Sequence, residues 1–495
     1  MPRVKCKLFN ALVWLGSGCS QAPNADPTPQ STTSSSFPSE LTSSTMTTED
    51  PTSSGPAVTS RTTGSIETTG LTEVSGSSDD TTGGPACDRP GGCDRLDVLL
   101  VIDNSGSMGE KQRRFVAALP HVLAGLRGLV DRDGVAVEAD INLMVTTTDI
   151  GHPLCEVFQK PGYEPAKGAP ISTSCTERLE RFNSINADET MPDICTDACP
   201  VGQSAAPTDS YIHFAGLTHN VIAAEGVLDP VERALACIVP QGIDGCGFEA
   251  PLEAMLLALD GGAVWNQGPR PFLREGAALA VVLLSDEMDC SIEDLKYFDP
   301  AFKDHPEFGK YYEVDPNTMK QAPPTSAICW NGGMTCSGPD ANGLFESCMA
   351  QDAGVLWPMA RYQDFLGHLS ESGKPTFMLV IGGVPSVTAH GSEAPHEPIS
   401  GGLEALTYHD WSEADLLQGD EDSSLDKQIE FGIGPGCSKK DIGYGIPPGR
   451  TVDVCQSLDS NDEIGCCVES VCDDDLRGAM DCLTGMASLR LLPQR

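Results

Sequence analysis

The sequence predicts an α/β protein in which helices flank a doubly wound, mainly parallel sheet. Four almost continuous apolar runs have the length of a strand, and strands with this pattern are buried on both faces, as in parallel sheets. Helical patterns separate these runs, and strands that alternate with helices form parallel sheets with right-handed crossovers. The four predicted strands span residues 96–102, 141–145, 279–284 and 376–381.

Four helices are predicted between and after these strands. The first follows the first strand, because large apolar residues recur there at three- and four-residue steps, and Pro120 within it is expected to bend it. The last is expected to begin with the acidic residues 473–475, which the helix dipole favours at an N-terminus. The stripe of the first helix comprises Phe115, Leu119, Val122, Leu126 and Leu129, and the other helices are predicted at 250–259, 355–369 and 473–489.

Three long insertions interrupt this pattern, at residues 152–210, 290–354 and 383–450, and each follows a predicted strand. The carboxyl ends of parallel strands lie along one edge of a sheet, where ligands bind in folds of this class. We therefore expect the three insertions to meet at a single rim.

The chain has 20 cysteines, and beyond Cys6 and Cys19 they fall in blocks of even number. This pattern predicts disulfides that brace the insertions, and therefore an oxidising compartment. No two cysteines form a CxxC pair, which weighs against a four-thiolate zinc site and against a thioredoxin-like redox pair.

Residues 1–19 have the composition of a signal peptide. Three basic residues precede a short apolar run, which is too short to cross a bilayer, and small residues come before Cys19. The final Gly-Ser-Gly-Cys resembles the bacterial lipobox, which implies that Cys19 is lipidated and becomes the new N-terminus. The alternative is an ordinary secretory signal that is cleaved nearby.

Residues 20–86 are rich in Ser, Thr, Pro and Gly and contain few large apolar side chains. Such a segment cannot bury enough apolar surface to offset its ordering entropy, so it is predicted to be a flexible stalk. Residues 87–495 then form the folded region, tethered to the membrane only by the lipid. Ser20 is not the acidic residue associated with inner-membrane retention, so the bacterial outer membrane or cell surface is the expected location.

The formal net charge of −40 makes binding to nucleic acid or to anionic lipid unfavourable, because lysine and arginine drive such contacts. Two interpretations of the charge remain. The carboxylates either form a solvated surface on which they repel one another, or they provide oxygen ligands for hard cations such as Ca²⁺ or Mg²⁺.

A D-x-S-x-S motif, Asp103-Asn104-Ser105-Gly106-Ser107, follows the first predicted strand and precedes the first predicted helix. As a bare string the motif is weak, and its placement at a strand-to-helix turn makes it specific. Carboxylate and hydroxyl oxygens are ligands that Mg²⁺ and Ca²⁺ accept. The alternative interpretation is that these side chains only cap the turn and the helix.

With this placement the chain resembles the von Willebrand factor type A family, in which such a motif forms the metal ion-dependent adhesion site. The resemblance covers about residues 94–490, interrupted by the insertions, and implies that Asp103, Ser105 and Ser107 bind a metal. It also implies Asp286 as the carboxylate of the third loop. Mg²⁺ is the expected ion, with Ca²⁺ or Mn²⁺ as alternatives, and its open coordination position takes an acidic side chain of a partner protein.

The second loop, residues 242–247, departs from the family, which has a threonine ligand there. Cys246 stands near that position, and we favour a Cys237–Cys246 disulfide over a thiolate ligand because Mg²⁺ and Ca²⁺ disfavour sulfur. The missing oxygen is then expected from one of four other residues, which are Asp244, Glu249, Thr147 and Thr148.

No catalytic residues are assigned, and the protein is not expected to be an enzyme. Its nine histidines are scattered, and neither an H-E-x-x-H nor a G-x-S-x-G motif occurs. The cluster of Asp286, Glu287 and Asp289 could in principle activate a metal-bound water, but no general acid is evident beside it.

Two functions of different classes remain. In the first, a cell-envelope lipoprotein binds a partner protein through the divalent cation of an adhesion site. In the second, the protein is a disulfide-braced envelope scaffold whose cation site is structural or vestigial. Calorimetric titration with divalent cations separates the two.

Overall fold

A central sheet organises the fold in the computed structural model, which describes residues 94–491 except 132–133, 158, 186–188, 353 and 461–462. The predicted signal peptide with Cys19 and the predicted stalk lie outside the described residues. Among the described residues, no helix combines the length and the hydropathy that a bilayer crossing requires.

Five strands of the sheet are parallel, and two short strands at one edge are joined to it and to each other by antiparallel pairing. All four predicted strands are present, as β1, β2, β7 and β13. Strand β19 escaped prediction because its sequence Cys-Cys-Val-Glu-Ser is not an apolar run. The order across the sheet is β19 (Cys466–Ser470), β13 (Thr376–Gly382), β7 (Ala278–Leu284), β1 (Arg95–Ile102), β2 (Asp140–Thr147), β4 (Ile212–Ala215) and β5 (Thr218–His219).

Helices cover both faces of this sheet, so the predicted mainly parallel sheet with flanking helices is confirmed. Side chains alternate between the faces of a strand. Leu100 and Ile102 of β1 therefore join one apolar core, and Leu99 and Val101 join the other. The first core includes α1 (Gly109–Arg127), α3 (Pro230–Ile238) and α9 (Arg477–Arg490), and the second includes α4 (Pro251–Ala258), α6 (Ala360–Glu371) and α8 (Gly449–Gln456).

The ends of three helices differ from their predicted positions. Helix α6, predicted at 355–369, begins at Ala360. Helix α1 begins at Gly109, earlier than its apolar stripe, and continues through the exposed Pro120. Helix α9 begins at Arg477, so the prediction that residues 473–475 form its first turn is wrong. The carboxylate of Asp473 instead accepts a hydrogen bond from the Val387 backbone N–H at 3.2 Å, which ties it to the segment after β13.

Segments after the carboxyl ends of β2, β7 and β13 contain short elements of their own. Strands β3 and β6 form one antiparallel pair, and β11 and β16 form another that joins the second segment to the third. The elements are α2 (Asp193–Ala198), β3 (Ala205–Pro207), β6 (Val221–Ala223), β8 (Val314–Asp315), β9 (Lys320–Gln321), α5 (Ala327–Gly333), β10 (Met334–Ser337), β11 (Leu344–Phe345), β12 (Ser347–Ala350), β14 (Ala389–His390), β15 (Pro398–Ser400), β16 (Tyr408–His409), α7 (Ser424–Phe431), β17 (Cys437–Lys439) and β18 (Gly443–Gly445).

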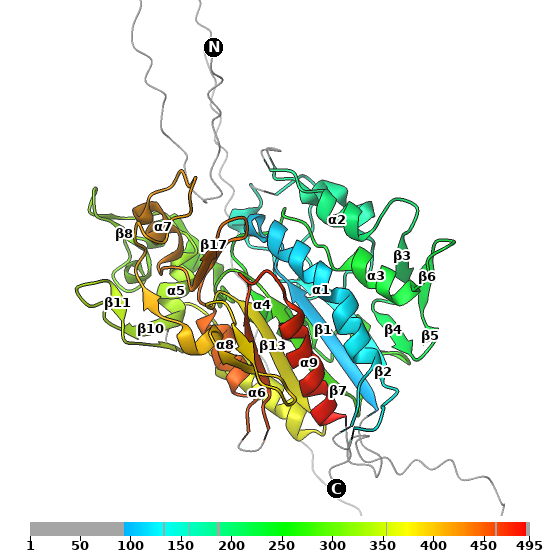
Figure 1. Ribbon diagram of the computed structural model, residues 1–495. Helices are drawn as coiled ribbons and strands as arrows, with labels where there is room; N and C mark the ends of the chain where they lie inside the picture. The colour runs from blue at the N-terminus through cyan, green and yellow to red at the C-terminus, as the bar shows by residue number, and fades with distance from the viewer. Residues whose placement is uncertain are drawn as a thin grey trace, which may run out of the picture. The chain divides into compact units, whose positions relative to one another are not determined.

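These three segments share a third apolar core at the carboxyl edge of the sheet. Cys155 from the first segment, Trp330 from the second and Trp411 from the third belong to it. In Figure 1, α5, α7 and β17 lie together beyond one end of the sheet. The segments therefore brace one another above the strand ends.

Eight disulfides are present among the described residues, which confirms the disulfide prediction. The predicted Cys237–Cys246 pairing is wrong, because Cys237 is buried with Cys199 in a core beside α2 whereas Cys246 belongs to the third core with Cys155. The pairs are Cys155–Cys246, Cys175–Cys195, Cys199–Cys237, Cys290–Cys329, Cys336–Cys348, Cys437–Cys472, Cys455–Cys466 and Cys467–Cys482.

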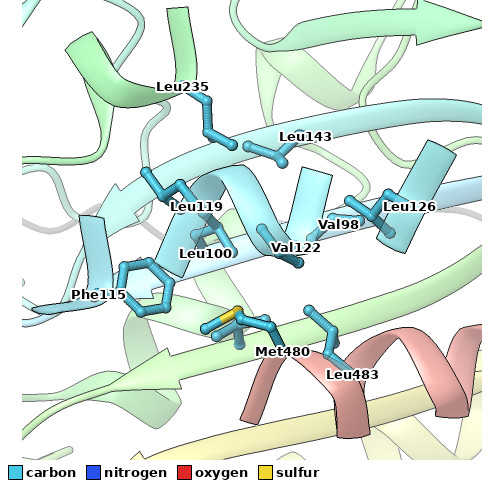
Figure 2. A pocket seen from close by; sticks show the side chains of 11 residues that line it. Val98, Leu100, Phe115, Leu119, Val122, Leu126, Leu143, Leu235, Met480 and Leu483 are labelled. Carbon is cyan, nitrogen blue, oxygen red and sulfur yellow. The ribbon is translucent and has the colours of Figure 1, made fainter. Parts of the chain in front are cut away.

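Helix α1 is held against the sheet by its apolar stripe. Figure 2 shows Phe115, Leu119 and Val122 of α1 facing a small cavity that side chains of the sheet and of α9 also line. Phe115 and Leu119 are each 1% exposed. Because α1 follows the D-x-S-x-S motif directly, this packing also fixes the position of the motif.

Truncation of this stripe is expected to destabilise the fold strongly. Replacement Leu119→Ala removes buried methyl groups and enlarges the cavity, so we expect a loss of about 2–5 kcal/mol in the free energy of unfolding, measured by urea denaturation. Leu217→Ala is the matched control, because Leu217 is 100% exposed, and its free energy should stay within about 0.5 kcal/mol of the wild type. Equal losses in both variants would contradict the proposed packing role.

Candidate functional site

The pairing of β1 with β7 brings the first and third predicted loops together. Ile102 lies opposite Leu284 in this parallel pair, so the residues that follow each strand leave the sheet side by side. The Asp103 backbone N–H donates to the Leu284 carbonyl at 2.9 Å. The Ser285 hydroxyl donates to Asp103 Oδ2 at 2.6 Å. The loops bearing Asp103 and Asp286 therefore meet at the carboxyl edge of the sheet.

The buried carboxyl of Asp103 is the centre of this group. Its Oδ1 accepts a hydrogen bond from the Ser105 backbone N–H at 2.8 Å. Burial, together with the nearby Asp286, raises the pKa of Asp103 to about 7. A cation at this carboxylate would offset both causes of the shift.

The two serines of the motif lie beside each other. Their hydroxyl oxygens are 3.3 Å apart. Ser105 stands at the N-cap of the short helical turn that follows, but its side chain makes no capping hydrogen bond. Capping therefore does not account for this hydroxyl, which interacts with Asp103 and lies beside the Ser107 hydroxyl, and both are neutral oxygens that a hard cation accepts.

Lys111 is a member of the group that the sequence reasoning missed. Its Nζ donates to Asp286 Oδ2 at 2.5 Å and to the Ser107 carbonyl at 3.1 Å. The side chains of Lys111 and Asp286 are 1% and 3% exposed. The available signal was the spacing, since Lys111 follows Ser107 by four residues, which brings two residues to the same face where the chain is helical.

The second loop contributes Glu249 and not Cys246. Ile102 pairs with Thr147, and the next residue, Thr148, donates its hydroxyl to the carboxylate of the fully buried Glu249. Burial and the nearby Asp103 raise the pKa of Glu249 well above its usual value. Two of the four predicted alternatives, Thr148 and Glu249, thus form a hydrogen-bonded pair beside Asp103.

The other residues considered for the second loop have different surroundings. Cys246 forms a disulfide with Cys155, so it offers no thiolate. Burial raises the pKa of Asp244 to about 6, and the positive charges of Lys160 and Arg181 oppose the shift. Asp244 therefore lies near these basic residues.

The acidic cluster after β7 is divided between two environments. Burial, Asp103 and Asp286 raise the pKa of Glu287 well above its usual value, so Glu287 lies near both aspartates. Asp289 instead accepts a hydrogen bond from Arg450 Nε at 3.0 Å and another from the Ser291 hydroxyl at 2.6 Å. Asp289 therefore serves the packing beneath the rim.

Among the buried side-chain oxygens that accept no hydrogen bond from the described residues, two belong to carboxyls whose charges interact with that of Asp103. An acceptor that is buried without a donor costs free energy, so a group of them points to a missing cation or other donor. These oxygens therefore fit a hard cation. They are Glu249 Oε1 and Asp286 Oδ1, and three further buried oxygens without a donor are Asn104 Oδ1, Thr147 Oγ1 and Asp244 Oδ1.

Within the part of the chain that the structure describes, no group of three or more His, Cys, Asp or Glu side chains is arranged to hold a metal ion. The oxygens collected at this edge are a mixture of carboxylates and hydroxyls. Comparisons of the chain with protein-family models, with curated proteins and with solved structures gave no match.

His152, near the site, provides a pH-dependent test of the rim. Its ring lies 4.5 Å from that of Phe248 and 4.7 Å from that of Phe298, and burial lowers its pKa to about 4. Below pH 6.5 the unfolded chain binds a proton that the folded chain excludes, so stability should fall as the pH drops toward 4. The expected loss is roughly 3 kcal/mol.

The measurement is the free energy of unfolding between pH 7 and pH 4 in wild type and in His152→Phe. This variant should lose that part of the pH dependence. Replacement of the exposed His219 by Gln is the control and should keep it. An unchanged pH profile in His152→Phe would show that His152 is not buried as an uncharged ring.

Proposed function

We propose that the protein has a doubly wound fold of the von Willebrand factor type A kind and binds a divalent cation at Asp103. Two features support the fold. Helices cover both faces of a mainly parallel sheet, and the D-x-S-x-S motif follows β1, its fourth strand of seven. The observation that carries the cation site is that Glu249 Oε1 and Asp286 Oδ1, in two buried carboxyls that interact with Asp103, accept no hydrogen bond from the described part of the chain.

In this proposal Asp103, Ser105, Ser107 and Asp286 hold the cation. Glu249, or Thr147 with an unpartnered hydroxyl, supplies the oxygen of the second loop. Mg²⁺ is the first candidate, because it takes oxygen ligands and keeps coordination positions open, and Ca²⁺ and Mn²⁺ are the alternatives. When bound, the cation supplies a position that accepts a carboxylate oxygen.

The function follows from this open position. The net charge of −40 repels an acidic partner at most of the surface. A cation at the strand ends is a local positive charge to which one Asp or Glu side chain can bind. We therefore assign the protein a binding role, adhesion to a partner protein through the metal, and assign no reaction to the site.

The proposed location is the bacterial cell envelope, with the chain exported and held by a lipid on Cys19. The eight disulfides support export, because such bonds form in oxidising compartments. The stalk of residues 20–86 would then carry the binding edge away from the membrane.

A disulfide-braced scaffold is the second candidate, and one observation favours it. Lys111 already neutralises Asp286 in a buried ion pair, so part of the negative charge at the site has a partner within the chain. In a scaffold the site needs no cation, and the rim segments provide the function.

Calorimetric titration with Mg²⁺, Mn²⁺ and Ca²⁺ distinguishes the candidates. The adhesion proposal predicts binding to the wild type and a loss of at least about tenfold in affinity for Asp103→Asn, because one negative charge of the site is removed. Asp260→Asn is a matched control. The exposed Asp260 side chain accepts a hydrogen bond from the backbone N–H of the residue two positions later, as the Asp103 side chain does. Absence of heat with all three ions would support the scaffold.

Partner binding gives a second test of the adhesion proposal. Protein immobilised through its C-terminus should retain a peptide that contains one Asp, and it should release the peptide when EDTA is added. The same peptide with Asn in place of Asp should not bind, because it lacks the carboxylate. Retention of both peptides in EDTA would contradict a metal-mediated contact.

A further inference from the structure

A lysine ammonium is built into the candidate cation site. Lys111 lies in the first turn of α1 and is 1% exposed. Its Nζ contacts two of the residues assigned to the site, through Asp286 Oδ2 at 2.5 Å and the Ser107 carbonyl at 3.1 Å. A positive charge is therefore fixed beside the position assigned to the metal.

The third rim segment encloses this ammonium. At Gly443 in β18, where φ is +98°, a Cβ would lie 3.3 Å from Lys111 Nζ. The Ile446 backbone N–H donates to the Asp286 carbonyl at 2.8 Å, which attaches the same segment to the other member of the ion pair. Lys111 therefore has little room to leave Asp286.

A buried lysine is costly unless a partner compensates its charge. Asp286 compensates it here, and the second oxygen of Asp286, Oδ1, accepts no hydrogen bond from the described residues. One carboxylate is thus shared between an internal cation and the position assigned to the metal. The charge of Lys111 consequently acts on whatever binds at Asp286 Oδ1.

We propose that Lys111 is the specificity-determining residue of the site. Its charge weakens the binding of the metal and strengthens the binding of an acidic ligand to the bound metal. This inference rests on the proposed function. Whatever charge the other carboxyls carry, Lys111 adds one positive charge. It therefore repels the metal ion, and it leaves the bound metal with more residual charge to attract a carboxylate from a partner.

The two effects have opposite signs, which separates this role from a purely structural one. Loss of the Lys111 charge should tighten metal binding and weaken the binding of a carboxylate to the metal-loaded protein. At the short distances within a site and an effective dielectric constant of about 20, each change should be at least about tenfold. A variant that only damages the fold would weaken both.

The experiment compares the full-length wild type with Lys111→Met, Lys111→Gln and Lys111→Arg. Calorimetry with Mg²⁺ measures metal affinity. Fluorescence anisotropy of labelled peptides with one Asp or one Asn, at saturating Mg²⁺, measures carboxylate affinity. Gln keeps a donor for the Ser107 carbonyl, so it serves if Met prevents folding, and Arg keeps the charge and should restore the wild-type pattern.

Lys374→Met is the matched control. Lys374 is also buried and pairs with Asp97 at 3.2 Å, near the start of β1 and therefore at the other edge of the sheet. Its loss should reduce stability and leave both affinities unchanged. This control separates the removal of a buried lysine from the removal of charge at the site.

Each outcome bears on a specific claim. Tighter Mg²⁺ binding with weaker Asp-peptide binding in Lys111→Met or Lys111→Gln supports the role of Lys111. Unchanged affinities, or a loss of both, overturn it even if the wild type binds Mg²⁺ and the proposed function stands. If only the variants bind Mg²⁺, the charge role of Lys111 is supported and the proposed function is contradicted. If no protein binds Mg²⁺, both are contradicted.

Discussion

The parallel pairing of β1 with β7 is the constraint on which the site depends. Because Ile102 lies opposite Leu284, the two strands end next to each other, and the loops that follow them bring Asp103 and Asp286 close together. The other neighbour of β1 is β2, which places Thr147 opposite Ile102. Three strand ends therefore assemble the oxygens, and a shift of one residue in either pairing would turn these side chains to the opposite face of the sheet.

The rim segments above these strand ends cover the carboxyl edge of the sheet and enclose it. Segments from three places in the chain share an apolar core, and the Cys155–Cys246 disulfide joins two stretches 91 residues apart. Such an enclosure lowers the local dielectric constant, which is why the pKa values of Asp103, Glu249 and Glu287 all rise. The same burial that makes these carboxyls costly strengthens their attraction for a cation.

Local patterns in the sequence predicted the fold framework and the candidate motif at the end of its first strand. The four buried strands were visible because each is an almost continuous apolar run, and the motif at Asp103 was visible because it stands at a strand end. Lys111 was hidden because a lysine near the start of a helix resembles a solvated one until Asp286 is seen beside it. The pairing of Cys246 was hidden because separate cores, not proximity along the chain, select its partner.

Strand β19 shows how adjacent cysteines can fasten a strand to the layers above and below it. Cys466 is bonded to Cys455 of α8, and Cys467 is bonded to Cys482 of α9, on the opposite face. This strand is the last in the sheet and has β13 as its one neighbour there. In the reduced chain only backbone pairing and packing hold β19 in the sheet. Formation of the two disulfides therefore protects this edge from detachment of the strand and from pairing with a strand of another chain.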